Sequence, residues 1–294
     1  MSIKIAVVIL NYNSSDDCRI CVSTLKKQQE AEFEIVIVDN CSKPEDRSAV
    51  ESLCREQNCI FIANNENRGY NAGNNVGLRY AAEHGFPYAL VCNPDMIFKR
   101  NDFLKTLVDV MEHDPEIAMC GSDVITPEGV HQNPKDAPEI CWYQSFYWVK
   151  SIFSRKNKSK VPNWVDSPDK SHFCKTLNGC CLILRVSFLQ KTGFFDERTF
   201  LYGEEPILAR QVELSGKKAF YTTETQAIHN HRKSKEGSSS FCAKYWKKSQ
   251  LLYNWYYSGY PFYGKCFAAV SIHMYFLTLN IYHLLKGDQR NAKN

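Results

Sequence analysis

An apolar run that ends in a carboxylate decides the fold of this chain: Tyr88-Ala89-Leu90-Val91-Cys92-Asn93-Pro94-Asp95. Five apolar residues bounded by a turn are typical of a buried strand in a parallel sheet. Open α/β sheets bind ligands outside the carboxyl ends of such strands, where Asp95 could hold a hard divalent cation against a diphosphate. Asn-Pro-Asp is also ordinary turn chemistry, so the segment by itself leaves both interpretations open.

The same pattern of short apolar runs and polar, periodic stretches repeats through the first 125 residues. We expect strands at 3–10, 33–38, 59–63, 88–92 and 117–124, with helices at 15–28, from Pro44 through Leu53, and at 70–84 and 102–113. Strict alternation of strand and helix implies right-handed crossovers and a parallel sheet covered on both faces. The predicted fold class is α/β, with a mostly parallel nucleotide-binding sheet flanked by helices.

The second half of the chain is less regular. Residues 126–175 are rich in Pro, Lys, Ser and aromatics, which is typical of a functional loop or lid. We then expect a strand at 177–186, a helix at 203–215, short strands at 218–222 and 226–229, and a helical appendage from about residue 236.

Composition places the chain among globular proteins. It has 294 residues, 44% of them hydrophobic and 23% charged, and a net charge of +4 that is too small to imply nucleic acid. The 13 cysteines form no framework, and Cys18-x-x-Cys21 lacks a second pair at zinc-finger spacing. The apolar run Ile5–Leu10 is too short for a secretory signal. We therefore expect reduced thiols and a cytoplasmic protein.

The basic charge gathers near the C-terminus. Residues 231–265 hold seven Lys and Arg against one acid, with Trp and Tyr between them at helical spacing. Such a segment suits peripheral contact with the inner face of a membrane. A helix packed on the core, or a dimer contact, explains it equally well. Residues 267–285 carry too many polar side chains to make a good membrane span.

Polar side chains follow each of the first four predicted strands. Asn11 and Asn13 follow the first, Asp39 the second, Asn64 the third, and Asn93 with Asp95 the fourth. Because parallel strands point the same way, these groups are expected to converge on one edge of the sheet. A carboxylate such as Asp39 can there accept a hydrogen bond from a base or a ribose; the alternative is a cap for the next helix.

Three glycines at four-residue spacing lie in the stretch 67–77 after the third strand. Gly69, Gly73 and Gly77 let the start of a helix approach a ligand or another backbone closely. Arg68 could meet a phosphate there, because helix N-termini favour anions. Close packing of helix on sheet is the other explanation, and the two are compatible.

Two further clusters could take part in chemistry. Glu204 and Glu205 open a predicted helix, where the dipole favours acids. Adjacent helical residues point about 100° apart, so one of them can face a cleft, where an apolar pocket would raise its pKa toward that of a general base. His229 and His231 share one face of a strand and could ligate Mn²⁺, although surface histidines would give the same pattern.

Taken in order, these motifs resemble those of the family 2 glycosyltransferases, which have the GT-A fold. The resemblance rests on 8–13, 38–42, 67–77, 93–95, 194–197, 202–205 and His229, and is closest to the bacterial rhamnosyltransferase-like branch. It covers about residues 3–235. It implies a GT-A domain at 1–235, with a nucleotide-binding half at 1–125 and an acceptor half at 126–235, followed by the basic aromatic segment 236–294.

The resemblance also implies an activity. It predicts inverting transfer of a sugar, with rhamnose as one candidate, from a nucleotide-diphospho-sugar to a saccharide acceptor that can be lipid-linked, in O-antigen, capsule or other cell-surface polysaccharide synthesis. The family's motifs map onto Asp95 and His229 as ligands of Mg²⁺ or Mn²⁺ and onto Glu205 as general base, with Glu204 as the alternative. Expected nucleotide-sugar contacts are Asn11, Asn13, Asp39, Arg68, Gly69, Gly73, Asn75, Asn93 and Arg210.

Departures from the family pattern leave a second hypothesis open. Asn93 stands where the metal motif usually begins with an acid, and Pro206 and Ile207 follow the paired glutamates. These features would also suit a catalytically silent nucleotide-sugar-binding or scaffold protein of a glycan assembly complex. Binding of nucleic acid through the basic segment is not expected. Donor choice is expected to depend on side chains near the cleft, with Trp142, Asn178 and Gly179 as candidates.

Overall fold

The computed structural model describes residues 4–135, 165–231 and 239–291. Within them the chain forms two compact units. The first unit takes 4–135, 165–200 and 204–231, and the second takes 201–203 and 239–291. The candidate lid at 126–175 falls largely outside the described residues, as does Trp142.

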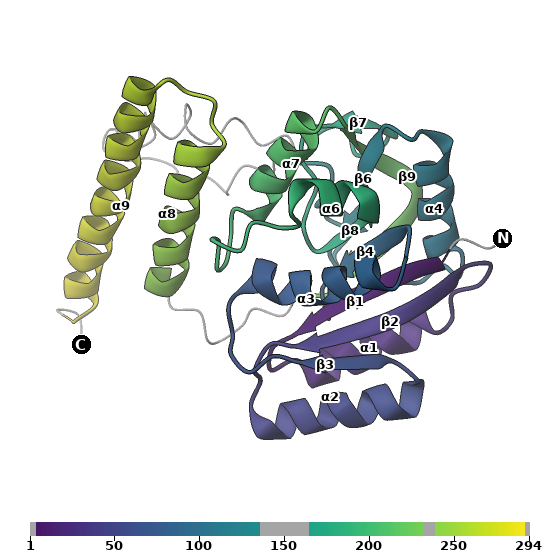
Figure 1. The fold of residues 1–294 in the computed structure, drawn as a ribbon. Coiled ribbons are helices and arrows are strands. Elements are labelled where there is room, and N and C mark those ends of the chain that lie inside the picture. Colours follow the sequence, from purple (N-terminus) through teal and green to yellow (C-terminus); the bar gives the residue numbers. More distant parts are fainter. Residues whose placement is uncertain (1–3, 136–164, 232–238, 292–294) are drawn as a thin grey trace. The chain divides into compact units, whose positions relative to one another are not determined.

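Helix and strand alternate through the first unit as the sequence predicts (Figure 1). The order is β1 (Lys4–Asn11), α1 (Ser15–Leu25), β2 (Glu32–Asp39), α2 (Pro44–Gln57), β3 (Ile60–Ala63), α3 (Tyr70–Glu83), β4 (Tyr88–Cys92), α4 (Phe103–His113) and β6 (Ile117–Ile125). A two-residue strand that the sequence did not reveal, β5 (Met96–Ile97), follows directly after Asp95.

The second half of this unit corrects two predictions. The strand expected at 177–186 is shorter, β8 (Cys181–Arg185), because helix α6 (Val186–Thr192) begins at once. The two short strands expected at 218–222 and 226–229 are one strand, β9 (Lys218–His229), with an irregularity in its pairing to β6 between Thr222 and Gln226. Helix α7 (Glu204–Leu214) precedes β9, and strand β7 (His172–Cys174) pairs with β9.

All these strands form one mixed sheet in the order β3-β2-β1-β4-β8-β6-β9-β5. Strands β1 to β4 are parallel, as expected. Beyond them, β8 lies antiparallel between β4 and β6, while β6 and β9 pair in parallel. In register, Asn11 lies opposite Asp39, and Cys92 lies opposite Ile9 on the same strand as Asn11. The polar residues that follow these strands therefore gather at one edge.

Buried apolar side chains form a core on each face of the sheet. Helices α1, α2 and α4 contribute to one core, and α3, α6 and α7 to the other (Figure 1). Gly73 and Gly77 let α3 lie close to the sheet: an added Cβ would come within 2.5 Å of the Leu10 side chain and 2.4 Å of the Val8 side chain. For these two glycines the packing interpretation is therefore sufficient.

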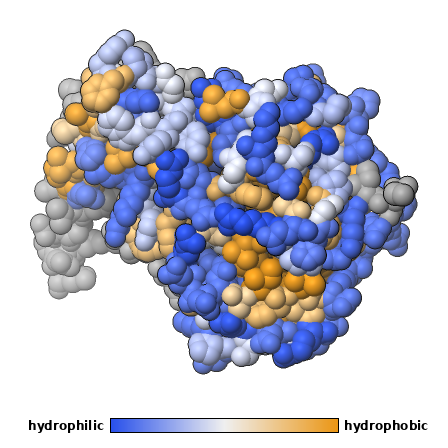
Figure 2. Space-filling view, viewed as in Figure 1, coloured by the Kyte–Doolittle hydropathy of each residue, from blue (hydrophilic) through white to orange (hydrophobic). Residues whose placement is uncertain are grey.

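The second unit contains α8 (Ser239–Tyr256) and α9 (Phe262–Asn291). Ile272, Tyr275 and Phe276 of α9 pack with Ala243 and Leu251 of α8. Large apolar side chains also stay exposed, and apolar patches on this pair are visible in Figure 2. Within the described part of the chain, no helix is long and apolar enough to cross a membrane.

Candidate active site

The carboxyl ends of β1 and β2 form a closed hydrogen-bond network. Asn11 Nδ2 donates to Asp39 Oδ1 at 2.9 Å and to Asp46 Oδ1 at 2.8 Å, and Asp39 Oδ2 accepts from the Ser42 amide at 3.2 Å. Asn11 and Asp39 are fully buried, and Asn13 Oδ1 accepts the Lys43 amide at 2.9 Å. These bonds of Asp39 lie in the turn before α2, as a cap for that helix would have them, and nucleoside binding by Asp39 stays a prediction.

Asp46 in α2 was not among the predicted site residues. Burial pushes its pKa upward, but hydrogen bonds from Asn11 and from the amides of Ser14 and Ser15 outweigh this and hold the pKa below its usual value. In the sequence, Asp46 is an acid in the first turn of the helix after Pro44. That position indicates stabilisation of the helix and does not predict a contact with Asn11, 35 residues away.

The start of α3 is attached to the segment 195–200. Gly69 has φ +97°, and a Cβ there would lie 2.3 Å from the carbonyl oxygen of Phe200, which accepts the Tyr70 amide at 2.8 Å. Asn75 is fully buried and bonds both backbone groups of Phe195 and the Glu197 carboxylate. The two close approaches hold the chain that leads into α7.

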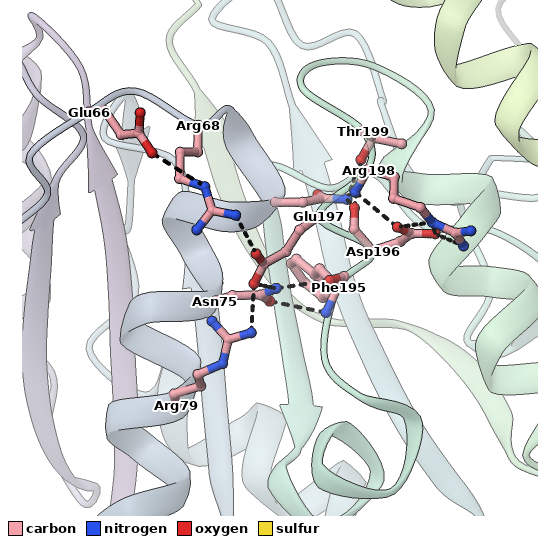
Figure 3. Close-up of polar contacts among 10 residues, drawn as sticks. Glu66, Arg68, Asn75, Arg79, Phe195, Asp196, Glu197, Arg198 and Thr199 are labelled. Atoms are coloured by element: carbon pink, nitrogen blue, oxygen red, sulfur yellow. Dashed lines mark hydrogen bonds and ion pairs between the residues drawn. The ribbon is translucent and has the colours of Figure 1, made fainter.

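Two arginines complete this attachment (Figure 3). Arg68 and Arg79 lie 3.3 Å and 2.6 Å from the Glu197 carboxylate. Arg210, on α7, pairs with Glu213 at 2.5 Å. The contacts seen for Arg68, Asn75 and Arg210 are thus with other residues of the protein, and their roles in binding a nucleotide-sugar stay predictions.

The first turn of α7 carries the two candidate bases. Lys135 Nζ lies 2.7 Å and 2.8 Å from the two carboxylate oxygens of Glu205, and the Gly179 amide donates to Oε1 at 2.9 Å. Sequence reasoning missed Lys135, since it lies 70 residues before Glu205 in an irregular stretch. No local pattern marks it.

The carboxylate with a raised pKa is Glu204. Burial, and then repulsion from Glu205, raise its pKa from 4.5 to about 7. Both glutamates line a small pocket that is partly open to solvent. The other lining residues come from α3, from β8 and the segment before it, from the segment before α7, and from α7 itself: Tyr70, Asn71, Gly179, Leu182, Phe195, Asp196, Ile207, Leu208 and Gln211.

A short chain of hydrogen bonds joins this pocket to the end of β4. The Tyr70 hydroxyl lies 3.0 Å from Asn93 Oδ1 and 2.9 Å from the Gly179 carbonyl oxygen. The Gly179 amide in turn contacts Glu205. Burial raises the pKa of Tyr70 well above its usual value, so its hydroxyl stays a neutral donor. Glu205 therefore lies at the same edge of the sheet as the Asn-Pro-Asp turn.

Asp95, His229 and His231 form a cluster at that edge. Asp95 Oδ1 lies 3.3 Å from His229 Nε2, and Asp95 Oδ2 lies 3.4 Å from His231 Nδ1. One ligand atom from each residue falls within 4.8 Å of the others. His231 joins the predicted pair, as the shared strand face suggested. Burial acts to raise the pKa of Asp95, but contacts with His229 and His231 leave it lowered.

Several features of the cluster fit a divalent cation. Asp95 Oδ1 and His229 Nε2 are buried and have no hydrogen-bond partner among the described residues. His229 Nδ1 lies 2.8 Å from Gln132 Oε1. A cation in place of the Nε2 proton would leave the other ring proton on Nδ1, donated to this oxygen, and would use the Nε2 lone pair. A histidine ligand of a metal usually donates its other ring N–H to an oxygen in this way, and imidazole with carboxylate suits Mn²⁺.

Solved structures with the same fold are glycosyltransferases of the GT-A type. A mannosyltransferase from Pyrobaculum calidifontis, solved with GDP-mannose and Mn²⁺, aligns over 100% of this chain and 81% of its own, with a TM-score of 0.58 and 13% identity. The S. aureus protein TarS, solved with UDP-GlcNAc, aligns over 93% and 73%, with a TM-score of 0.58 and 16% identity.

Sequence comparison gives the family. The glycosyl transferase family 2 profile matches residues 6–176, so the chain belongs to that family. A hexosyltransferase of low-salt glycan biosynthesis in Haloferax volcanii is 24% identical over 68% of this chain and 59% of its own length. The rhamnosyltransferase WbbL of Escherichia coli is 22% identical over 76% and 82%. The chain thus spans under two thirds of the first of these relatives.

Proposed function

We propose that this chain is an inverting glycosyltransferase that moves a sugar from a nucleotide-diphospho-sugar to a saccharide hydroxyl. The observation that carries the proposal is the joining of two groups through Tyr70 and Gly179: a pocket with Glu204 and Glu205, and a carboxylate–histidine cluster around Asp95. Sugar transfer by a single displacement needs a base beside the acceptor hydroxyl, and a cation site beside the leaving diphosphate suits the same reaction. Here both lie at one edge of the sheet.

The chain's own groups supply the steps. The Glu205 carboxylate takes the proton from the acceptor hydroxyl as the oxygen attacks the anomeric carbon. The bond to the nucleotide diphosphate breaks on the opposite side, so the configuration inverts and the electron pair leaves with the diphosphate. The fixed network of Asn11 and Asp39 at the ends of β1 and β2 is the proposed site of the nucleoside.

Asp95 and His229, with His231, would hold Mg²⁺ or Mn²⁺. A bound cation would supply positive charge to the leaving diphosphate. Asn93 has an uncharged amide in place of a carboxylate, and its Oδ1 lies 3.0 Å from the Tyr70 hydroxyl. The charge at the cluster therefore comes from Asp95.

We extend the proposal to the acceptor. Relatives include a rhamnosyltransferase of Mycobacterium tuberculosis named for N-acetylglucosaminyl-diphospho-decaprenol and a Haloferax volcanii glucuronosyltransferase named for glucosyl-dolichyl phosphate. These names favour a lipid-linked saccharide in the synthesis of a cell-surface polysaccharide, with rhamnose as the first sugar to test.

Membrane contact from the cytoplasmic side would bring a lipid-linked acceptor to the site. Exposed aromatic and aliphatic side chains of α9 support such a contact, among them Phe262, Tyr263, Phe267 and Val270. The lysines of α8, which include Lys247, suit anionic headgroups.

The test combines binding and turnover. Thermal-shift measurements against a panel of nucleotide-sugars, with and without Mn²⁺, identify the donor, and transfer to a lipid-linked or free saccharide is then followed by mass. We expect Glu205→Gln to keep donor binding and to lose transfer by about 10²–10⁴-fold. Glu213→Gln, on the same helix with its side chain 70% exposed, is the control that keeps both. Full turnover in Glu205→Gln would exclude Glu205 as the base.

One observation favours the alternative of a silent nucleotide-sugar-binding protein. The Lys135 ammonium contacts both oxygens of Glu205, where a base needs a free lone pair. Donor binding without transfer or hydrolysis, with and without Mn²⁺, would establish that alternative.

A further inference from the structure

Lys135 is held by its backbone on one side and by the Glu205 carboxylate on the other. Its amide donates to the Thr176 carbonyl oxygen at 3.0 Å, and isolated β-bridges join it to Val165 and Thr176. Its ammonium contacts both carboxylate oxygens of Glu205. The two side chains are 31% and 21% exposed, so this pair is partly withdrawn from water and is less screened than a surface pair.

The other titratable groups around Glu205 leave its charge to depend on the contact with Lys135. Glu204 is its neighbour on α7, Tyr70 faces it from α3, and Cys180 faces it from the segment before β8. Burial raises the pKa of the Tyr70 hydroxyl and of the Cys180 thiol, so both are neutral at pH 7. Among the described residues, Glu204 is the adjacent acid, Asp196 also lines the pocket but pairs with Arg198, and Lys135 is the cation that contacts Glu205.

Two adjacent carboxylates in one pocket do not ionise independently, because each charge disfavours the other. A cation that contacts one of the two carboxylates favours its ionised form, so that this carboxylate loses its proton first as the pH rises. A general base must be ionised when it meets the hydroxyl, so the group that fixes the charge on Glu205 also fixes its readiness to react.

We propose that Lys135 is a positioning residue that keeps Glu205, rather than Glu204, ionised and turned toward the pocket. This inference rests on the proposed function of Glu205 as base. The Gly179 amide holds Oε1, so the acceptor hydroxyl replaces the ammonium at Oε2 and Lys135 keeps its contact with Oε1. Lys135 itself takes no proton from the acceptor.

The experiment compares Lys135→Met, Lys135→Arg and Lys217→Met. Lys217 is the matched control, since it is 32% exposed and its ammonium contacts Pro115 and Glu116, at 2.7 Å from the latter, neither of which lines the pocket. The measured quantity is the pH profile of kcat for transfer. We expect the acidic limb to move up by about one pH unit in Lys135→Met, and to stay in place in Lys135→Arg and Lys217→Met. A Lys135→Met profile that only falls in height, with its limb unmoved, would overturn the proposal.

A second readout needs no turnover. In the Glu204→Gln background, the Gly179 amide resonance reports the ionisation of Glu205 through its hydrogen bond. We expect its titration midpoint to rise when Lys135→Met is added and to be restored by Lys135→Arg. If no transfer is found but this midpoint rises, the proposed function fails and the role of Lys135 stands. If transfer is found and both readouts are unmoved, the role of Lys135 fails alone.

Discussion

The starts of α3 and α7 differ in how their polar groups are satisfied, although a residue of each lines the same pocket. The first turn of α3 has no acid and follows a glycine pressed against the Phe200 backbone. The amide groups of Asn75 bond the segment 195–197. The first turn of α7 has two acids, one with a raised pKa and one held by Lys135.

The difference indicates that the start of α3 stabilises the fold, while the start of α7 carries the groups proposed for catalysis. At α3 the protein satisfies its own groups, so a substitution there should cost stability. At α7 the protein keeps a partly buried carboxylate whose ionised form is unfavourable, so a substitution there should cost activity and can raise stability. Strained or unsatisfied groups are expected where a ligand completes the site.

The largest effect is expected at Gly69. Gly69→Ala puts a Cβ at φ +97°, 2.3 Å from a backbone oxygen. Strain and overpacking together should cost about 4 kcal/mol of unfolding free energy, measured by urea denaturation. Gly85→Ala is the control, because Gly85 has φ +73° but no atom within 4 Å of the added Cβ; it should lose roughly 1 kcal/mol. Equal losses would show that the contact with Phe200 is unimportant.

The next effect has the opposite sign and depends on pH. The pKa of Glu204 is raised from 4.5 to about 7 in the folded state, so its contribution to stability is full below pH 4.5 and is lost as pH rises through 7. Glu204→Gln should therefore be more stable than wild type at pH 8 by about 3 kcal/mol.

The same comparison at pH 4.5 should show little of that gain. Unfolding free energies of both proteins at the two pH values check the prediction. A gain of equal size at both pH values would mean that ionisation of Glu204 is not its cause.

A smaller loss of stability is expected at Asn75. Asn75→Ala removes three hydrogen bonds and leaves the buried amide and carbonyl of Phe195 without their partner. The expected cost is about 2 kcal/mol, read from the midpoint of denaturation. Asn101→Ala, at an exposed position, should change stability by less than about 0.5 kcal/mol.

The smallest effect is expected at the surface of the same attachment (Figure 3). Arg79→Met removes an ion pair with Glu197 in which the arginine is 46% exposed. Its cost should be under about 1 kcal/mol and should shrink in high salt. A loss as large as that of Asn75→Ala would show that the arginines, and not the buried amide, hold the segment before α7.

The sequence predicted β1 to β4 well because each strand and helix there is marked by its own periodicity. It also placed Asp95 after β4, His229 at the end of β9 and the Glu204–Glu205 pair at the start of α7, and their roles stay predictions. It missed the antiparallel β8 because an apolar run carries no sign of strand direction. It missed Lys135 and Gln132 because neither lies in a periodic segment.

Local pattern thus determined which segments are strands and helices and which polar groups stand at their ends, because backbone geometry repeats over a few residues. Tertiary structure alone decided which of those groups meet. Lys135 reaches Glu205 across 70 residues, and Gln132 reaches His229 across 97. Such contacts depend on the path of the whole chain around the sheet, and so do the ion pair that holds Glu205 and the contact that orients the His229 ring.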